Sequence, residues 1–397
     1  MKHLLSVGKV VPMLFNGKLI SIKVRINIKG YKGKTIIFKD SYLMLPLSLR
    51  QLCNSFKVDS VKGYFPFKLT DISYTGTFPN YDLITSLSLP EYLDIKNLHS
   101  NKIWSFKKEA IKYCKLDCLS LHQILTKFSE LIFKEFKVDP IRSLTLPALA
   151  MRIYKTHFMP ADTIYQILDQ PQELIRNSYT GGSVDVYIPS FTATKAEHET
   201  TKLYYYDVNS LYPSVMLNNP MPVGKPVAFL GDIRDVENNP FGIFYCKITS
   251  PDNLEHPILQ RRIKTANGIR TIAGLGSWEG WIFSEEMYNA MKYGYTFEIS
   301  KGYEFETGDI FSGYVSKMYS LRLQYPKGDA MNLIAKLLMN SLYGKFGMKL
   351  DSTKVEIVNN NSNKLNKYLD KYNSNIEDII YLDNHTVLIV NNTKFTP

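Results

Sequence analysis

The sequence predicts a mixed fold that combines α/β and α+β segments, and three observations indicate it. Two strand patterns joined by a turn stand near the N-terminus, in residues 18–28 and 34–39. A long helical pattern with one apolar stripe follows at 107–136. An apolar strand pattern at 203–208 then leads into a helix start at 210–217. Strands and helices in this alternation predict layered modules with buried sheets.

The remaining elements are read in chain order from the same periodicities and from turn residues. We expect short helices after Pro46 and after residue 143, and a longer helix near the C-terminus; their ranges are 47–56, 144–157 and 329–344. A Gly-Gly turn lies in 177–183, and 376–390 reads as a hairpin. The apolar stripe of the long helix is expected to comprise Ile111, Cys114, Cys118, Leu121, Ile124 and Leu125.

Composition and charge limit the classes of protein. The chain has 397 residues, enough for two or three domains, and no apolar run long enough for an ordinary membrane span. We therefore expect no membrane partner. Of the eleven excess positive charges, ten lie in residues 1–65, where 12 Lys or Arg face only Asp40 and Asp59. Such a basic segment suits a polyanion such as nucleic acid, and a solvated charged face is the alternative.

Asp207 is the first candidate for chemistry. It closes the apolar strand pattern, and a helix begins three residues later. A carboxylate held at a sheet edge can ligate a divalent metal, with the Val208 carbonyl beside it. The free amides of the helix start can receive a phosphate. The alternative is that Asp207 caps the helix.

The second candidate is one face of the predicted C-terminal helix. Lys336, Asn340 and Tyr343 stand at i, i+4 and i+7, so they share this face. Together they offer a cation for phosphates, an amide and an aromatic ring for stacking, which is what a nucleotide needs. Gly344 beside Tyr343 leaves room for a close backbone approach. An ordinary amphipathic surface helix is the alternative.

Both segments together resemble motifs A and B of family B DNA polymerases. The first is Asp207-Val-Asn-Ser-Leu-Tyr-Pro-Ser, and about 130 residues later comes Lys336-Leu-Leu-Met-Asn-Ser-Leu-Tyr-Gly. Tyr179-Thr-Gly-Gly resembles the element that joins the exonuclease and polymerase modules. Tyr113-Cys-Lys-Leu-Asp117 resembles the third exonuclease motif. The chain as a whole resembles the middle of protein-primed members of the type that linear mitochondrial plasmids encode.

The resemblance implies template-directed nucleotidyl transfer, with DNA template and primer, deoxynucleoside triphosphates and a terminal protein as partners. It implies that Asp207 binds two Mg²⁺ ions with help from the Val208 carbonyl. It further implies a set of nucleotide contacts, namely Leu211, Tyr212, Lys336, Asn340 and Tyr343. The implied DNA contacts are Tyr179, Gly181, Gly182 and Gly344, and the exonuclease remnant is Tyr113 with Asp117. Arg322 and Lys327 are weaker phosphate-contact candidates, with solvated surface charge as the alternative.

The resemblance also implies a domain order. A partial ribonuclease-H-like exonuclease domain is expected first, followed by a family B palm with its fingers helix. The expected segments are 1–140 exonuclease-like, 141–200 connector with the Tyr-x-Gly-Gly loop, 201–221 palm motif A, 222–310 first terminal-region insertion, 311–350 fingers with motif B, and 351–397 second insertion.

Two departures from the family pattern shape the functional expectation. No Asp-x-Glu element precedes Tyr113, where the exonuclease pattern requires it, the motif C string Tyr-x-Asp-Thr-Asp is absent, and Asp383 reads as a turn residue. Because two metals need more than one carboxylate, we expect a chain truncated at both ends and inactive by itself. The alternatives are a non-catalytic DNA-binding remnant, and one half of a split polymerase completed in trans. Lys outnumbers Arg 38 to 10, an AT-rich bias that together with the resemblance favours a mitochondrial location.

Overall fold

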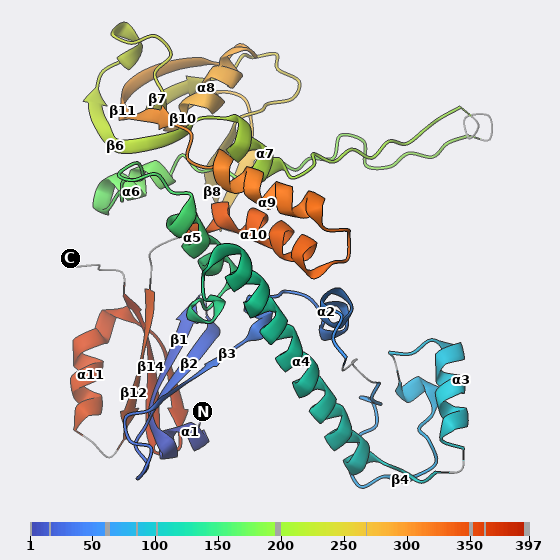
Figure 1. The fold of residues 1–397 in the computed structure, drawn as a ribbon. Coiled ribbons are helices and arrows are strands. Elements are labelled where there is room, and N and C mark those ends of the chain that lie inside the picture. Colours follow the sequence, from blue (N-terminus) through green and yellow to red (C-terminus); the bar gives the residue numbers. More distant parts are fainter. Residues whose placement is uncertain are drawn as a thin grey trace. The chain divides into compact units, whose positions relative to one another are not determined.

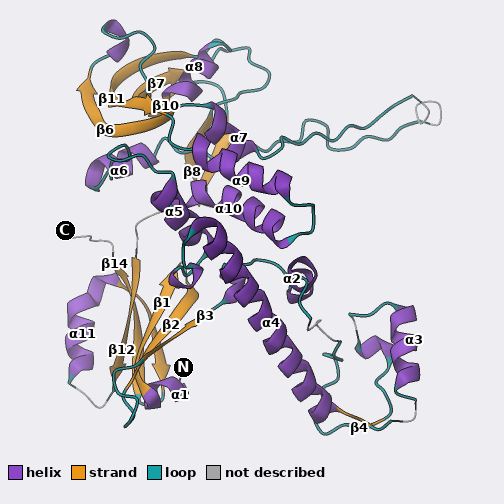
Figure 2. Cartoon of the chain, viewed as in Figure 1, coloured by secondary structure: helices purple, strands orange, loops and turns teal. Residues whose placement is uncertain are grey.

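The chain folds into two compact units, each described by itself. The computed structural model describes residues 2–15, 17–59, 64–84, 86–100, 102–194, 200–266, 268–348, 352–360 and 363–392. One unit combines Met1–His157 with Ser316–Pro397, and the other is Phe158–Val315. Both mix helices with antiparallel sheets, which confirms the mixed character predicted from the sequence (Figure 1 and Figure 2).

The first unit begins with a three-stranded antiparallel sheet in the order β1-β2-β3. The short helix α1 (Lys2–Val7) precedes β1 (Gly8–Phe15), β2 (Lys18–Ile26) and β3 (Thr35–Lys39). This confirms the predicted pair of strands and adds β1. The elements that follow are η1 (Ser41–Leu43), α2 (Leu49–Phe56), β4 (Thr75–Gly76), η2 (Tyr81–Leu83), α3 (Leu89–Leu98) and β5 (Trp104–Ser105).

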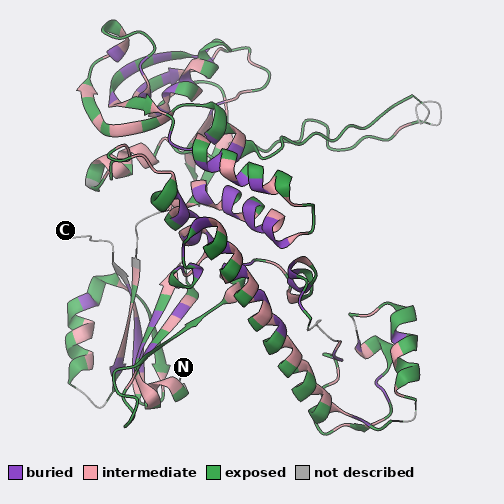
Figure 3. Ribbon diagram, in the orientation of Figure 1, coloured by how far each residue is buried: buried purple, intermediate pink, exposed green. Residues whose placement is uncertain are grey.

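Three helices form the centre of this unit. The long α4 (Phe106–Phe136) is followed by η3 (Pro140–Arg142) and α5 (Leu146–His157), and α10 (Ala330–Phe346) packs against α5. The stripe that α4 buries is Ser120, Ile124, Phe128, Ile132 and Phe136, a spacing of four residues along one face. The expected stripe is therefore wrong at its N-terminal end, where Ile111, Cys114 and Cys118 are exposed (Figure 3).

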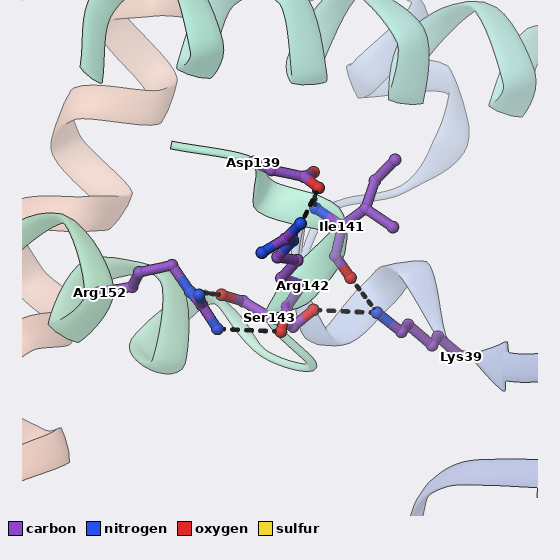
Figure 4. A network of polar contacts seen from close by, with 6 residues as sticks. All are labelled: Lys39, Asp139, Ile141, Arg142, Ser143 and Arg152. Carbon is purple, nitrogen blue, oxygen red and sulfur yellow. Dashed lines mark hydrogen bonds and ion pairs between the residues drawn. The ribbon is translucent and has the colours of Figure 1, made fainter. Parts of the chain in front are cut away.

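A polar network joins the end of β3 to the connection between α4 and α5 (Figure 4). The Lys39 ammonium donates to the carbonyls of Ile141 and Ser143. Arg152 of α5 donates to the Ser143 hydroxyl at 3.3 Å and to the Arg142 carbonyl at 3.2 Å. These contacts satisfy carbonyls of the turn at η3, so the sheet is anchored to the helices through one short segment.

The C-terminal part of the same unit is a second three-stranded sheet, in the order β12-β14-β13. Its strands are β12 (Ser352–Asn359), β13 (Ile376–Leu382) and β14 (His385–Asn392), with α11 (Lys364–Tyr372) and η6 (Asn373–Asn375) between them. The predicted hairpin at 376–390 is thus confirmed. Asp383 lies in its two-residue turn with a φ of 45°, as expected of a turn residue.

The second unit is built on a four-stranded antiparallel sheet in the order β10-β7-β11-β6. Its strands are β6 (Met221–Leu230), β7 (Gly242–Thr249), β10 (Ser277–Phe283) and β11 (Thr296–Gly308). Alternate residues of β7 are buried, and α8 (Ser284–Met291) covers the same face. The core comprises Phe244, Cys246, Ile248, Ile282, Met287, Ala290, Tyr295, Phe297 and Ile299, with neighbours at its edge.

The remaining elements of this unit flank the sheet. They are α6 (Asp169–Arg176), α7 (Leu211–Asn218), η5 (Ile233–Asp235) and a separate hairpin of β8 (Gln260–Thr265) and β9 (Gly268–Ala273). The helix α9 (Ser312–Gln324) runs across the boundary between the units.

The predicted strand at 203–208 does not form. Residues 200–208 are irregular, and Tyr204, Tyr205 and Tyr206 are 69%, 95% and 85% exposed. A strand needs a neighbour to pair its peptide groups, and no described strand pairs with this segment. The apolar, tyrosine-rich composition of this segment favours a strand, but composition does not supply the neighbouring strand.

Glu304 of β11 gives the second unit a testable pH dependence. Its hydrogen bond with the Glu237 carboxyl and its partial burial raise its pKa from the usual 4.5 to about 6. The folded state therefore binds a proton more tightly than the unfolded chain, so stability increases as the pH falls from about 6 towards 4.5. We expect Glu304→Gln to abolish this increase, because an amide has no proton to gain.

The measurement is urea unfolding across this pH range in a Trp104→Phe background, so that the fluorescence comes only from Trp278 and Trp281 of this unit. Glu306→Gln on the same strand is the matched control and is expected to retain the increase. An unchanged pH dependence in Glu304→Gln would show that other groups produce it.

Candidate functional site

Asp207 and Val208 lie in an exposed loop that leads into α7. Leu211 and Tyr212 are the first two residues of that helix, and both are about half exposed, at 49% and 52%. Pro213 follows at the third position and is buried, so it anchors the helix start by packing. The sequence order thus places a carboxylate, a carbonyl and a helix N-terminus within six residues on an accessible surface.

The helix cap is Ser210 and not Asp207. Ser210 takes a left-handed conformation with a φ of 51°, and its side chain makes no capping hydrogen bond. The alternative interpretation of Asp207 as the cap of α7 is therefore wrong. A left-handed serine is an uncommon backbone state, and such states concentrate where a turn must hold neighbouring groups in place.

The Tyr-x-Gly-Gly loop is tied to the hairpin of β8 and β9 in the same unit. Arg262 donates from Nη2 to the Tyr179 carbonyl at 3.1 Å, and Gln260 donates from Nε2 to the Gly181 carbonyl at 3.3 Å. The Tyr179 ring is 67% exposed, and a Cβ added at Gly181 or Gly182 would meet no atom within 4 Å. The loop therefore presents a bare backbone and a free aromatic face on one side.

In the first unit, α10 has the predicted two-faced character. Its N-cap Asp329 accepts a hydrogen bond from the Met331 amide at 2.8 Å. Lys336, Asn340 and Gly344 are exposed and Tyr343 is half-buried. The opposite face buries Met331, Ile334, Ala335, Leu338, Met339 and Leu342. The packing of the apolar face thus fixes which side chains of α10 remain accessible.

Arg322 differs from a solvated surface charge. Its Nε is buried and has no hydrogen-bond partner within the described residues, and its carbonyl accepts from Asn332 of α10 at 2.8 Å. A buried guanidinium nitrogen without an acceptor is costly unless a water, an ion or a ligand supplies one. Lys327 is exposed, which is compatible with a phosphate contact and with a solvated surface charge alike.

Tyr113 and Asp117 share one face of α4, as their spacing predicts. The Tyr113 ring packs against Phe65 and Phe67, with centroids 5.4 and 5.7 Å away. One carboxylate oxygen of Asp117 is buried and has no hydrogen-bond partner among the residues that the structure describes. A buried carboxylate oxygen without a hydrogen-bond partner calls for an explanation, such as a bound water or ion.

Within the described ranges, no group of three or more His, Cys, Asp or Glu residues could hold a metal ion. Neither Asp207 nor Asp117 therefore belongs to such a group among the described residues. No described helix is long and apolar enough to cross a membrane.

Sequence reasoning missed the contacts of β8 with the Tyr-x-Gly-Gly loop. The residues involved are about 80 positions apart, so no local periodicity reports the contact. The available signal was the basic run Gln-Arg-Arg-Ile-Lys in 260–264, flanked by turn residues.

The fold is similar to that of solved structures of Phi29 DNA polymerase. A structure of Phi29 DNA polymerase with primer-template DNA and incoming nucleotide substrates matches with a TM-score of 0.56 and 18% identity, over 88% of this chain and 56% of that one. A second, with primer-template DNA alone, matches with a TM-score of 0.53 and 21% identity, over 89% of this chain and 55% of that one. At this identity the likeness establishes a shared mixed α/β fold.

The family follows from the sequence itself. The family of DNA polymerases type B, organellar and viral, matches residues 1–396, and the chain belongs to this family. A protein of Ascobolus immersus named "Probable DNA polymerase" is 38% identical over 86% of this chain and 29% of its own length. One of Neurospora intermedia with the same name is 36% identical over 88% of this chain and 37% of its own length. The chain thus spans about a third of these relatives.

The buried oxygen of Asp117 predicts an effect on stability. Asp117→Asn removes a charge from an atom without a hydrogen-bond partner in the described residues, and we expect the variant to be more stable by about 1 kcal/mol. Asp370→Asn makes the same change at an exposed position of the helix α11 and is expected to stay within about 0.5 kcal/mol. Thermal unfolding of both variants measures the difference. Equal effects would mean that burial of Asp117 carries no penalty.

Proposed function

We propose that this chain is the central portion of a protein-primed family B DNA polymerase, whose reaction is template-directed transfer of a deoxynucleotide to a primer hydroxyl. Family membership is the observation that carries the proposal. The accessible Asp207 segment at α7 and the accessible polar face of α10 support it, because they match the motifs that the reaction uses.

In this proposal the segments keep the order expected from the sequence. Residues 1–140 belong to a partial ribonuclease-H-like exonuclease domain and 141–200 to the connector. Motif A of the palm follows at 201–221. The first insertion (222–310), the fingers (311–350) and the second insertion (351–397) complete the chain.

The incoming triphosphate is assigned to groups that suit its chemistry. The amides of Leu211 and Tyr212 at the start of α7 can donate to phosphate oxygens, and the helix dipole favours negative charge there. On α10, the Lys336 ammonium supplies a compact charge and the Asn340 amide a donor. The half-buried Tyr343 ring offers a fixed surface for the nascent base pair.

Template contacts are assigned to the Tyr-x-Gly-Gly loop. The exposed ring of Tyr179 can stack on a base, and the bare backbone at Gly181 and Gly182 allows a close approach of the sugar-phosphate chain. Gly344 provides similar room on α10, because a Cβ there would meet no atom within 4 Å.

The donor set at Asp207 suits Mg²⁺ but is incomplete for two ions. A carboxylate and the neighbouring carbonyl of Val208 are hard oxygen ligands of the kind that Mg²⁺ prefers. Two-metal catalysis needs further carboxylates, and the described residues offer no acidic cluster. We therefore assign Asp207 and Val208 to metal binding and derive no catalytic step from this chain by itself.

Two further assignments belong to the proposal. Mitochondrial location and a linear-plasmid origin are supported by the organellar and viral character of the family and by the Lys-rich composition. A terminal protein is the expected priming partner. The absence of an acidic cluster in the described residues also favours the alternative of a DNA-binding, non-catalytic chain.

Primer extension tests the proposal directly. We expect the purified chain to bind a primer-template duplex but to extend it at no measurable rate with Mg²⁺ and deoxynucleotides. A second polypeptide that supplies the motif C carboxylates should restore extension. In that restored system, Asp207→Ala should lower the extension rate by about 10³-fold or more. Extension by the unassisted chain that is lost in Asp207→Ala would contradict the expected inactivity. Failure to bind DNA would contradict the polymerase assignment.

The salt dependence of DNA binding should depend on the basic N-terminal segment. Lys29, Lys32 and Lys34 are exposed in the connection of β2 and β3, beside a pocket lined also by Lys9 and Arg25. If each contacts one phosphate, changing all three to Gln lowers the slope of log K against log salt by about 0.9 per contact on duplex DNA. Fluorescence anisotropy at several salt concentrations measures it. An unchanged slope would place the DNA elsewhere.

A further inference from the structure

A pocket of about 390 Å³ lies between the Tyr-x-Gly-Gly loop, β8 and the edge strand β10 of the second unit. Its walls come from Asn177 and Ser178 ahead of the loop, from Arg261 on β8, and from Trp278 on β10. Pockets of this size accommodate small ligands.

Arg261 and Trp278 form one wall of the pocket. The guanidinium carbon lies 5.1 Å from the Trp278 ring centroid, a cation–π arrangement. The Arg261 Nε is buried, yet no hydrogen-bond acceptor for it exists within the described residues. A guanidinium with one face on an aromatic ring keeps its other face available for a flat ligand, and its buried N–H still needs an acceptor.

The other walls offer hydrogen-bonding groups to the edge of such a ligand. In the described part of the chain β10 pairs only with β7, so one row of its peptide groups faces away from the sheet. Glu286 of α8 also lines the pocket, and burial raises its pKa. Its carboxyl oxygens add hydrogen-bond acceptors to the wall of the pocket. A flat ligand with hydrogen-bonding groups along its edge would therefore match both the stacking wall and the polar walls of the pocket.

The pocket continues onto a basic ribbon. Residues 259–274 contain Arg261, Arg262, Lys264 and Arg270 and no acidic residue. The last three are exposed, so the ribbon can follow a phosphate backbone that leaves the pocket. This continuity favours a strand over a free nucleotide as the source of the flat ligand.

We propose that this pocket binds one unpaired base of single-stranded template DNA, stacked on the guanidinium of Arg261, while the ribbon of β8 and β9 holds the flanking phosphates. The proposal rests on the proposed function, because it takes DNA as the substrate. It adds a base-binding position on Arg261, separate from the Tyr179 ring that the proposed function assigns to the template. Guanidinium planes and aromatic rings are established stacking surfaces for splayed bases.

The test compares two single-stranded 12-mers of equal charge, one of thymidylate and one that is fully abasic, by fluorescence anisotropy with the full chain. We expect the wild-type chain to bind the thymidylate strand about tenfold more tightly than the abasic strand. Arg261→Gln should remove most of this difference. Arg270→Gln removes the same charge from the same hairpin outside the pocket, and it should weaken both strands equally and keep the difference.

Tryptophan fluorescence gives a second readout. The chain has three Trp residues, and both Trp278 and Trp281 line the pocket, so Trp104→Phe leaves reporters at the pocket alone. The thymidylate strand should quench this fluorescence in the Trp104→Phe chain but not after Arg261→Gln is added. Thymidine monophosphate should quench it at least tenfold more weakly.

The outcomes separate this inference from the proposed function. No binding to either strand would overturn both. Binding without a preference for bases, or equal effects of Arg261→Gln and Arg270→Gln, would overturn the pocket and leave DNA binding intact. Equally strong quenching by thymidine monophosphate would show that the pocket takes a free nucleotide. The comparison of the two strands with the wild-type chain needs no variant, so it stands even if Arg261→Gln folds poorly.

Discussion

The packing of α10 against α5 determines what the first unit can offer to a ligand. The two helices bury residues such as Leu338 and Met339 on one side and Leu149 and Ile153 on the other. Since an α-helix has fixed angular spacing, burying this face leaves Lys336 and Asn340 in water. Without this contact, α10 could turn about its own axis, and the polar side chains on its outer face would then point in other directions. The chemistry of this helix is therefore set by its apolar residues.

Helices with strong periodicity were predictable from the sequence because their signal is local. The helices predicted at 107–136 and 329–344 end within two residues of α4 and α10, and the hairpin of β13 and β14 forms where 376–390 predicted it. The failure at 203–208 has the opposite cause. Its composition favours a strand, but a strand is stabilised by pairing with a neighbour, and that information lies outside the segment.

The residues of the candidate site also fall into two groups: those that local spacing predicts and those that depend on tertiary contacts. Tyr113 with Asp117 and Lys336 with Asn340 stand on single helices, so spacing alone places each pair on one face. The support of the Tyr-x-Gly-Gly loop by Gln260 and Arg262 is a tertiary contact, and the same holds for Arg261 on Trp278. Neither has a periodic signature, although the basic run in β8 marks where to look. Motif residues are thus easier to find than the residues that hold them.

Nucleic-acid binding and phosphoryl transfer require different kinds of side chains. The described residues include the kinds that binding uses but no cluster of carboxylates. Nucleic acid needs cations, flat surfaces and bare backbone, which exposed Lys, Arg, Tyr and Gly side chains supply one at a time. Phosphoryl transfer needs several carboxylates around two metal ions, and removing any one of them disrupts the whole set. Asp207 stands without such companions in the described ranges. In general, affinity for a polyanion is distributed over many residues and metal-dependent chemistry is concentrated in a few, so a substitution can affect one without the other.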